Sequence, residues 1–234
     1  MNVNTYAPMA LSKAQENTLL RSVYNWMMVG LFLSGLTAYF AANNSAVQQM
    51  IFGNSFTIWF LFLGELALVF AISGGMKSMS SSTAGILFVL FAVINGLTIS
   101  SIFIVYTMQS ISTTFFITAL TFGATSFYGY ITKTDLTSIG KYLFMALIGI
   151  IIATLVNFFV HSSTLNWIVS YIGIIIFVGL TAYDTQKIKN IGAKMLDRET
   201  EQFRRIAIIG ALALYLDFIN LFLILLRFTG GGRD

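Results

Sequence analysis

The chain has 234 residues, of which 57% are hydrophobic and only 9% charged. Soluble domains average about 25% charged residues, so too few charges remain to cover a water-facing surface, and a soluble globular domain is excluded. The absence of cysteine excludes a disulfide framework and a thiolate metal site. The net charge of +4 could attract nucleic acid, but the positions of the basic residues indicate a membrane topology and no nucleic-acid partner.

Long uncharged stretches define the predicted elements. Asp, Glu, Lys and Arg are absent from Ser22 to Gly64, from Ser78 to Thr132 and from Tyr142 to Tyr183. One bilayer crossing needs about 20 apolar residues, so each stretch has room for about two crossings. We therefore predict an all-α polytopic membrane protein with seven transmembrane helices, at about Val23–Ala42, Phe56–Met76, Ala84–Thr107, Ser112–Ile131, Tyr142–Val160, Asn166–Thr185 and Ile206–Phe228.

The basic residues predict the orientation and the division of the chain. We expect a cytoplasmic N-terminal segment (residues 1–22) without a removable signal peptide, a transmembrane domain (residues 23–228) and a short tail (residues 229–234). The charged connection from Gln186 to Arg205 should lie at the membrane surface. Arg227 and Arg233 are the exceptions to the positive-inside rule. The cytoplasmic segments then hold 11 of the 13 basic residues: Lys13, Arg21, Lys77, Lys133, Lys141, Lys187, Lys189, Lys194, Arg198, Arg204 and Arg205.

Three acidic residues, Glu65, Asp184 and Asp217, fall within the predicted spans. A charge at the centre of a span costs about 2.5–3.5 kcal/mol on insertion scales, and acids that remain there usually face the protein interior and mark ion or proton pathways. A structural hydrogen bond between helices is the alternative interpretation. Three acids in one small bundle favour the functional interpretation.

Asp184 and Asp217 are the candidates for a pair. Asp217 lies about midway along the seventh span, on a stripe of small and polar residues, and Asp184 lies near the cytoplasmic end of the sixth, one turn before Lys187. Counting along the helices at about 1.5 Å per residue leaves an axial offset of about 10 Å, so spacing alone does not show contact. If the two carboxyl groups meet, they resist double ionisation and titrate as a unit, which is a physical basis for a pH-controlled gate. The stripe consists of Gly210, Ala213, Asp217, Asn220 and Arg227.

Hydroxyl groups cover one face of the fourth predicted span. The favoured interpretation is packing between helices, with each hydroxyl bonded to the carbonyl group four residues earlier. The alternative is a polar lining for water or ions, to which Asn95, Asn157 and Asn220 on other spans would contribute. The residues of this face are Thr114, Thr118, Thr121, Thr125, Tyr128 and Thr132.

Four strings of residues resemble the Bax inhibitor-1 family, also called the transmembrane Bax inhibitor motif family, and its bacterial branch in particular. The resemblance extends over most of the chain from about Leu20, and YDTQ and LDFINLF are its most specific parts. The strings are GLTISSIFIVYT (Gly96–Thr107), FMALIGIIIATLVNFF (Phe144–Phe159), YIGIIIFVGLTAYDTQKIK (Tyr171–Lys189) and ALYLDFINLFLILLRF (Ala213–Phe228).

The resemblance implies a fold in which the seventh helix is central and surrounded by spans 1–3 and 4–6. It also implies a pH-sensing aspartate pair at the cytoplasmic side, which maps onto Asp184 and Asp217. Some relatives use a basic residue at the end of span two as a latch on this pair and an acid in span two on the ion path. Lys77 and Glu65 match those positions, although a lysine lacks the bidentate geometry of an arginine latch.

The function implied by the resemblance is a proton-sensitive cation leak, with Ca²⁺ as the permeant ion. Because Ca²⁺ prefers oxygen ligands, we expect transient binding near Asp184 and Asp217 and no resident metal or cofactor. The alternative is a regulatory protein that binds a membrane-anchored AAA protease, with its polar N-terminal segment contacting that partner. In either case we expect a protein of a bacterial inner membrane with its N-terminus in the cytoplasm.

An intramembrane aspartyl protease is a third hypothesis. Tyr183-Asp184 matches the first motif of presenilin-type proteases. Their second motif is Gly-x-Gly-Asp, whereas this chain has Leu214-Tyr215-Leu216-Asp217, and their Pro-Ala-Leu string is absent because the single proline is Pro8. We therefore predict that the protein is not an enzyme.

Overall fold

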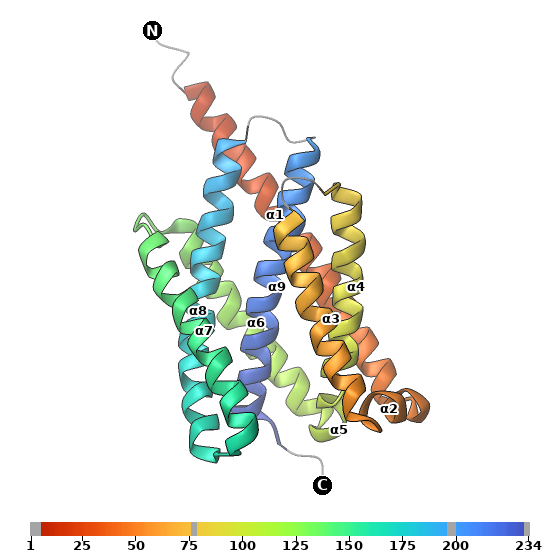
Figure 1. Cartoon of the computed structure of the whole chain (residues 1–234). Helices are drawn as coiled ribbons and strands as arrows, with labels where there is room; N and C mark the ends of the chain where they lie inside the picture. The colour runs from red at the N-terminus through yellow and green to blue at the C-terminus, as the bar shows by residue number, and fades with distance from the viewer. Residues whose placement is uncertain (1–5, 76–78, 196–199, 232–234) are drawn as a thin grey trace. The chain divides into compact units, whose positions relative to one another are not determined.

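The computed structural model describes residues 6–75, 79–195 and 200–231, and it is all-helical in these ranges (Figure 1). In a bilayer core a helix satisfies its backbone hydrogen bonds internally, which is why long apolar segments fold in this way. The helices are α1 (Tyr6–Ala42), α2 (Ser45–Phe52), α3 (Ser55–Gly74), α4 (Ser81–Ile99), α5 (Ile102–Val105), α6 (Met108–Ile131), α7 (Thr137–Val160), α8 (Ser163–Lys194) and α9 (Glu201–Thr229).

Six of the seven predicted spans are confirmed as helices long and apolar enough to cross a membrane. The predicted fourth span, Ser112–Ile131, is also helical as α6, but its many Thr and Ser residues lower its hydropathy and it is not among the six. A crossing by α6 therefore stays a prediction. In the described part of the chain the six are Asn17–Ala42, Phe56–Gly74, Ser81–Val105, Thr137–Val160, Ser163–Lys194 and Glu201–Thr229.

The connection predicted from Gln186 to Arg205 is shorter in the structure, and its place at the membrane surface stays a prediction. Helix α8 continues to Lys194 and α9 begins at Glu201. Both extensions bury apolar side chains, because Ile188 is 5% exposed and Phe203 is 6% exposed. The charged residues of this segment therefore lie mainly on helix ends.

Short connections are fixed by side-chain caps. Asn44, Asn54 and Ser80 precede α2, α3 and α4, and each accepts hydrogen bonds from backbone N–H groups of the first helical turn. Such caps satisfy groups that the helix itself leaves unpaired. At the end of α7, His161 adopts a left-handed conformation with a φ of 53°, which reverses the chain toward α8.

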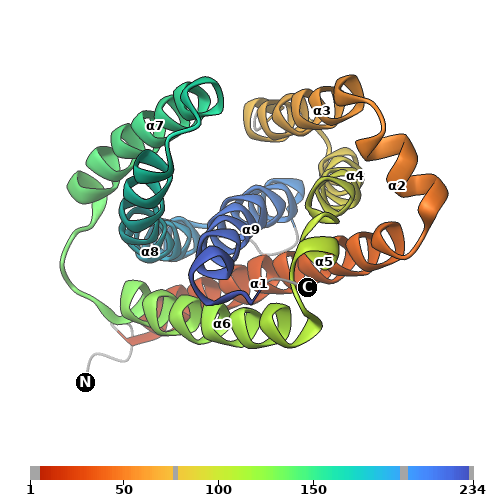
Figure 2. The ribbon, with the colours of Figure 1, turned by 90° about the horizontal axis from the view of Figure 1, so that it is seen from below.

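Packing divides the chain into two compact units, and α9 contributes to both. Unit 1 comprises Met1–Met108, Asn190–Tyr215 and Gly231–Asp234. Within it α4 lies between α1 and α3 (Figure 2). A Cβ atom on Gly96 would lie 2.6 Å from the carbonyl oxygen of Ser34, so the backbones of α4 and α1 approach closely there.

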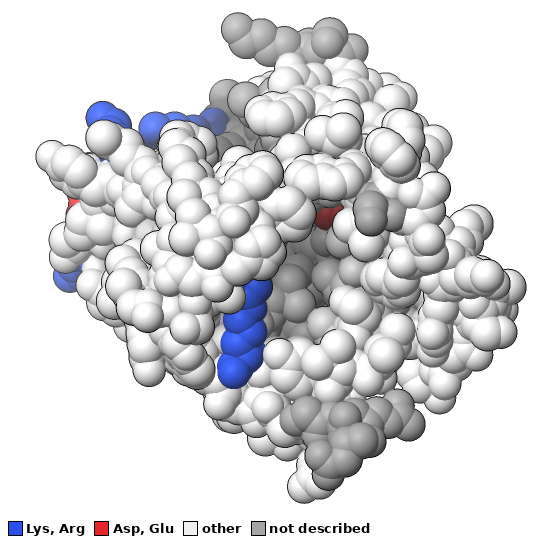
Figure 3. Space-filling model, turned by 60° about the horizontal axis from the view of Figure 1, so that its bottom comes forward, with Lys and Arg blue, Asp and Glu red and all other residues white. Residues whose placement is uncertain are grey.

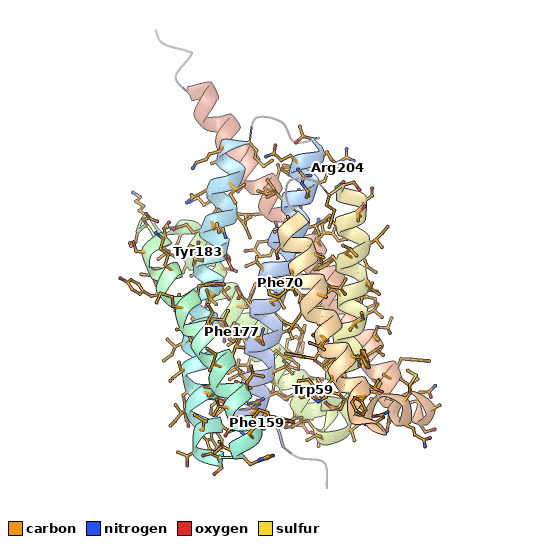
Figure 4. All side chains as sticks on the ribbon, in the orientation of Figure 1. Trp59, Phe70, Phe159, Phe177, Tyr183 and Arg204 are labelled. Carbon is orange, nitrogen blue, oxygen red and sulfur yellow. The ribbon has the colours of Figure 1, made fainter. Side chains whose placement is uncertain are left out.

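Unit 2 comprises Gln109–Lys189 and Leu216–Gly230. One buried hydrophobic cluster of this unit consists of Ile176, Phe177, Leu180 and Leu221. Figure 4 labels Phe177 of this cluster and Tyr183, six residues later on α8. Helices α6 and α8 touch where a Cβ atom on Gly129 would lie 2.3 Å from the carbonyl oxygen of Ala182. This contact positions the turn of α8 that includes Asp184.

Large apolar side chains cover the outer surface. Phe60 on α3 is 74% exposed. Phe70 on α3 and Phe159 on α7, both labelled in Figure 4, are 73% and 77% exposed. Most of the face in Figure 3 is uncharged; Lys and Arg side chains lie along one edge and near its centre, and an acidic side chain also shows near the centre. An uncharged aromatic surface of this kind fits a lipid environment and would aggregate in water.

Candidate functional site

Asp217 is the most deeply buried acid of the described residues. It lies in the part of α9 that belongs to unit 2, and it is 4% exposed. Its Oδ2 atom is buried and has no hydrogen-bond partner among the described residues. An unpaired buried polar group costs about 1–3 kcal/mol, and more if it is charged. Its position therefore lowers stability, and the oxygen is suited to bind a proton or a cation.

Asp184 lies on α8 in the same unit and is half-buried. Its charge acts on Asp217, and the charge of Lys187 acts on Asp184. The Lys187 Nζ atom also lies 5.6 Å from the centre of the Tyr183 ring. The two aspartates therefore lie in one unit, close enough for the charge of one to act on the other, and contact between their carboxyl groups stays a prediction.

Gln186 fixes the turn of α8 that includes Asp184. Its Oε1 atom accepts a hydrogen bond from the backbone N–H of Leu136 at 2.9 Å, and its Nε2 atom donates to the carbonyl oxygen of Thr134 at 2.8 Å. Gln186 is 6% exposed, so these bonds satisfy backbone groups that water reaches poorly. Gln186 is the last residue of the YDTQ string, but the string alone does not reveal which backbone groups it bonds.

The other polar groups of this region link α8 to α6. The hydroxyl groups of Thr185 and Ser126 are hydrogen-bonded at 3.1 Å. Lys189 Nζ donates to the carbonyl oxygen of Tyr130 at 2.8 Å. These bonds hold the backbone around Asp184 against α6. A change in the charge of the Asp184 carboxyl group therefore acts on side chains whose backbone is fixed by these bonds.

The pair has a simple acid–base chemistry. Ionising both carboxyl groups places two negative charges in a region of low effective dielectric constant, whereas one bound proton removes the repulsion between them. Carboxyl groups that meet in this way would bind and release protons as one site, a role that stays a prediction for Asp184 and Asp217.

Glu65 belongs to a separate polar cluster in unit 1. Thr98 Oγ1 donates to Glu65 Oε1 at 2.5 Å, and Asn95 Nδ2 donates to Glu65 Oε2 at 3.1 Å. The Tyr215 hydroxyl donates to Asn95 Oδ1 at 2.7 Å and lies 2.6 Å from the Ser34 hydroxyl oxygen. Tyr215 and Ser34 were not predicted as site residues, because a single Tyr or Ser in an apolar span gives no sequence signal.

The remaining predicted lining residues form hydrogen bonds to backbone groups four or five residues away in the chain. The hydroxyl groups of Thr118, Thr121 and Thr125 each donate to the carbonyl oxygen four residues earlier, at 2.7, 2.9 and 2.6 Å. Asn157 Oδ1 accepts from a backbone N–H five residues later at 2.9 Å, and Asn220 Nδ2 donates to a carbonyl oxygen four residues earlier at 2.8 Å. This is the geometry of the packing interpretation, and a role in lining an ion path stays a prediction.

The predicted latch residue, Lys77, lies outside the described residues. Hydrogen bonds connect the first residues of α4 and α9 in unit 1. The Glu201 carboxylate accepts hydrogen bonds from the N–H and the hydroxyl group of Ser81. Arg205 Nη1 donates to the carbonyl oxygen of Met79 at 2.7 Å. Within the described ranges, no three side chains of His, Cys, Asp or Glu gather as metal ligands.

Comparison with known proteins decides the family. A profile of the family described as Inhibitor of apoptosis-promoting Bax1 matches residues 16–234. The chain belongs to the Bax inhibitor-1 family. This Bax inhibitor-1 protein is 52% identical over 221 residues to inner membrane protein YbhL of Escherichia coli strain K12, which covers 94% of each chain.

More distant relatives of the Bax inhibitor-1 chain also match along nearly the whole length. A protein of Borreliella burgdorferi is 49% identical over 219 residues, covering 94% of each chain. A membrane protein of Streptococcus pyogenes serotype M3 is 34% identical over 222 residues, covering 92% of this chain and 93% of the relative. The protein is therefore an integral membrane protein, and the resemblance found in the four strings is confirmed.

Proposed function

We propose that this Bax inhibitor-1 protein is a pH-sensitive cation leak of a bacterial inner membrane, with Ca²⁺ as the permeant ion. The supporting observation is the pair of acids in unit 2, in which Asp217 has a buried oxygen without a partner among the described residues and Asp184 acts on it electrostatically. An acid that lowers the stability of the fold and is nevertheless present within a membrane span usually has a functional role.

The proposed gate works through the number of protons on the pair. With one shared proton, Asp184 and Asp217 together have a single negative charge, which is compatible with close packing of α8 against α9. Losing that proton adds repulsion inside a poorly hydrated region, and gaining a second proton removes the remaining negative charge. Either change alters the free energy of the contact between the helices and shifts the equilibrium between closed and conducting states.

The proposed permeant ion follows from the available ligands. Carboxylate, hydroxyl and carbonyl oxygens suit a hard cation such as Ca²⁺, and an ion that passes through should be held only briefly. Glu65 is proposed as a second acid on the ion path, and Lys77 as the latch. Ca²⁺ is the cargo in this proposal and not a resident cofactor.

The proposed topology has seven crossing helices, with the N-terminus in the cytoplasm and α9 at the centre. Helix α6 has 24 residues, about 36 Å at 1.5 Å per residue, against a hydrocarbon core of about 30 Å. Its bonded hydroxyl groups lower the cost of a lipid environment. A central α9 is supported by its burial, since 61% of its most apolar window is buried against 6% for α3 and α7.

Ion flux in liposomes tests the proposal. Purified wild type should release Ca²⁺ at a rate that depends on pH when the pH is scanned from about 6 to about 8, because the charge of the pair changes when it binds or releases a proton. Asp184→Asn and Asp217→Asn should each lose most of this pH response. Asp135→Asn, which changes an exposed acid in the connection between α6 and α7, is the matched control. A response equal to wild type in both pair variants would refute the gate.

A regulatory role is the second candidate. It is supported by the length of α1, which begins at Tyr6, whereas the candidate span within it begins at Asn17. A helical segment before the membrane could bind a partner such as a membrane-anchored AAA protease. Deleting Met1–Glu16 should lower capture of the protease while Ca²⁺ flux persists; loss of flux with unchanged capture would argue against this role.

A further inference from the structure

A chain of short polar contacts joins four helices of unit 1. It begins on α3 with Glu65, which contacts Thr98 and Asn95 on α4 at 2.5 and 3.1 Å. It continues to Tyr215 on α9 at 2.7 Å and to Ser34 on α1 at 2.6 Å. The Ser34 hydroxyl oxygen then lies 2.6 Å from the carbonyl oxygen of Ala92 on α4.

The five contacts between helices need five hydrogens, but the side chains supply four when Glu65 is ionised. The Ser34 and Thr98 hydroxyl groups also lie 3.0 and 3.2 Å from the carbonyl oxygens of Gly30 and Ile94 in their own helices, so these two longer contacts share the same hydrogens. The hydroxyl groups of Thr98, Tyr215 and Ser34 supply one each, and the amide of Asn95 directs one N–H toward its neighbour in the chain. If Asn95 Nδ2 faces Glu65, Tyr215 donates to Asn95. The hydrogen of Ser34 can then serve either the Tyr215 hydroxyl or the Ala92 carbonyl, although both lie 2.6 Å away.

Turning the Asn95 amide by half a rotation moves this shortage to the contact between Asn95 and Glu65. Nδ2 then donates to the Tyr215 hydroxyl, Tyr215 donates to Ser34, and Ser34 donates to the Ala92 carbonyl. The two orientations of an amide occupy nearly the same space, so the heavy-atom contacts fit both. Asn95 Oδ1 now faces Glu65 Oε2, and a hydrogen between these two oxygens must come from Glu65.

We propose that Glu65 and Asn95 form a proton-binding site separate from Asp184 and Asp217, in which protonated Glu65 donates to the turned amide of Asn95. All five contacts then contain a hydrogen. When Glu65 releases its proton, the amide turns back and either the Ser34–Tyr215 or the Ser34–Ala92 contact loses its hydrogen. The site therefore links a proton on α3 to the packing of α1, α4 and α9, and it does not rest on the proposed leak.

The partners of Glu65 do not compensate the negative charge of its carboxylate. The groups that face the carboxyl group are Thr98 and Asn95 of α4, and the titratable group that feels its charge is Tyr215 of α9. Helix α2, which also packs on α3, contains no titratable residue. Because Thr98, Asn95 and Tyr215 are uncharged, a bound proton is the charge compensation that these partners leave to Glu65.

Isotope-edited infrared spectroscopy of the wild-type protein in lipid nanodiscs tests the proposal without a substitution. Glutamate labelled with ¹³C at the side-chain carboxyl group distinguishes Glu65 from the aspartate pair. The other glutamates are Glu16, Glu199 and Glu201, which lie at or beyond the ends of the predicted spans. At about pH 7 we expect a protonated-carboxyl C=O band that moves to lower frequency on labelling. A spectrum in which no such band responds to the label would overturn the proposal.

Two variants test the assignment and the link. Glu65→Gln should abolish the labelled band, because its amide replaces the protonated carboxyl group as donor to Asn95. In Tyr215→Phe three contacts remain for three hydrogens, so the extra proton is no longer needed, and the band should weaken at least twofold at the same pH. Tyr39→Phe, at a residue that is 51% exposed, should leave the band at the wild-type intensity. An unchanged band in Tyr215→Phe or Glu65→Gln would overturn the proposal.

Discussion

Replacing Gly129 by alanine tests how tightly α6 is held against the turn of α8 that includes Asp184. The added Cβ atom would lie 2.3 Å from the carbonyl oxygen of Ala182 and 2.9 Å from its Cα atom. Both are backbone atoms, so no side chain can rotate to make room. Relieving the overlap requires the two helices to separate by about 1 Å, a typical consequence of inserting a methyl group into a packed interface.

The expected magnitude combines two opposing effects. Overpacking of this kind costs about 1–3 kcal/mol, whereas Gly→Ala in a helix gains up to about 1 kcal/mol. A net loss of about 1–2 kcal/mol in the free energy of unfolding should lower the Tm by about 2–8 °C for a chain of this size. The displacement should also alter the pH response of Ca²⁺ flux, because Asp184 lies two residues after Ala182.

The assay is thermal unfolding in detergent, followed by flux in liposomes. Gly123→Ala is the matched control, since it lies on the same helix and its Cβ atom would have nothing within 4 Å. The control should have a Tm equal to or above that of wild type and an unchanged pH response. If Gly129→Ala matched Gly123→Ala in Tm, the close approach of α6 and α8 would be refuted.

Two further predictions concern the connection between α6 and α7. Gln186→Leu removes the partners of the Leu136 N–H and the Thr134 carbonyl. We therefore expect a loss of about 1–3 kcal/mol in the free energy of unfolding and faster hydrogen exchange at the Leu136 amide. Gln202→Leu, at an exposed position, is the control, and equal exchange in both variants would contradict the assignment. The hydrogen bonds from Thr137 lower the pKa of Asp135 below its usual value of 3.8. The stabilisation by this carboxylate is therefore present above about pH 4 and lost as the pH falls through the lower pKa of the folded state. The Tm difference between wild type and Asp135→Asn should shrink in acid. A difference that grows would contradict the assignment.

The spans could be predicted because a bilayer sets their length and excludes charge. The helix ends could not, because the buried Ile188 and Phe203 stand among the charged residues of the segment from Gln186 to Arg205. The many charged residues of this segment favour a connection at the membrane surface and conceal the apolar spacing that continues the two helices. The predicted crossing of Ser112–Ile131 remains open for the opposite reason, since its hydroxyl groups lower the hydropathy of a helix that has sufficient length.

The site residues were predictable one by one, but their partners were not. Asp184, Asp217 and Glu65 stand out because a charge within an apolar span is costly. The proximity of Asp184 and Asp217 depends on helix tilt and register, which residue spacing does not determine. The contacts of Glu65 come from Asn95, Tyr215 and Ser34 on three other helices, and a single hydroxyl or amide in an apolar span is common enough to give no signal.

The stripe predicted around Asp217 illustrates the same limit. Gly210 and Asp217 are buried as expected, whereas Asn220 is half-buried and Arg227 is exposed. A helical face predicted from spacing extends along the entire helix. Ala213, between the buried Gly210 and Asp217, is also only half-buried, so residues that share a face by spacing differ in burial along the same helix.

The most direct measurement of the central claim is a double-mutant cycle on the pH dependence of Ca²⁺ flux, using wild type, Asp184→Asn, Asp217→Asn and the variant with both changes. If the two carboxyl groups share protons as one site, the double variant should respond to pH no differently from either single variant. If the two changes add in the logarithm of the flux at each pH, the aspartates titrate independently and a shared proton does not control the leak.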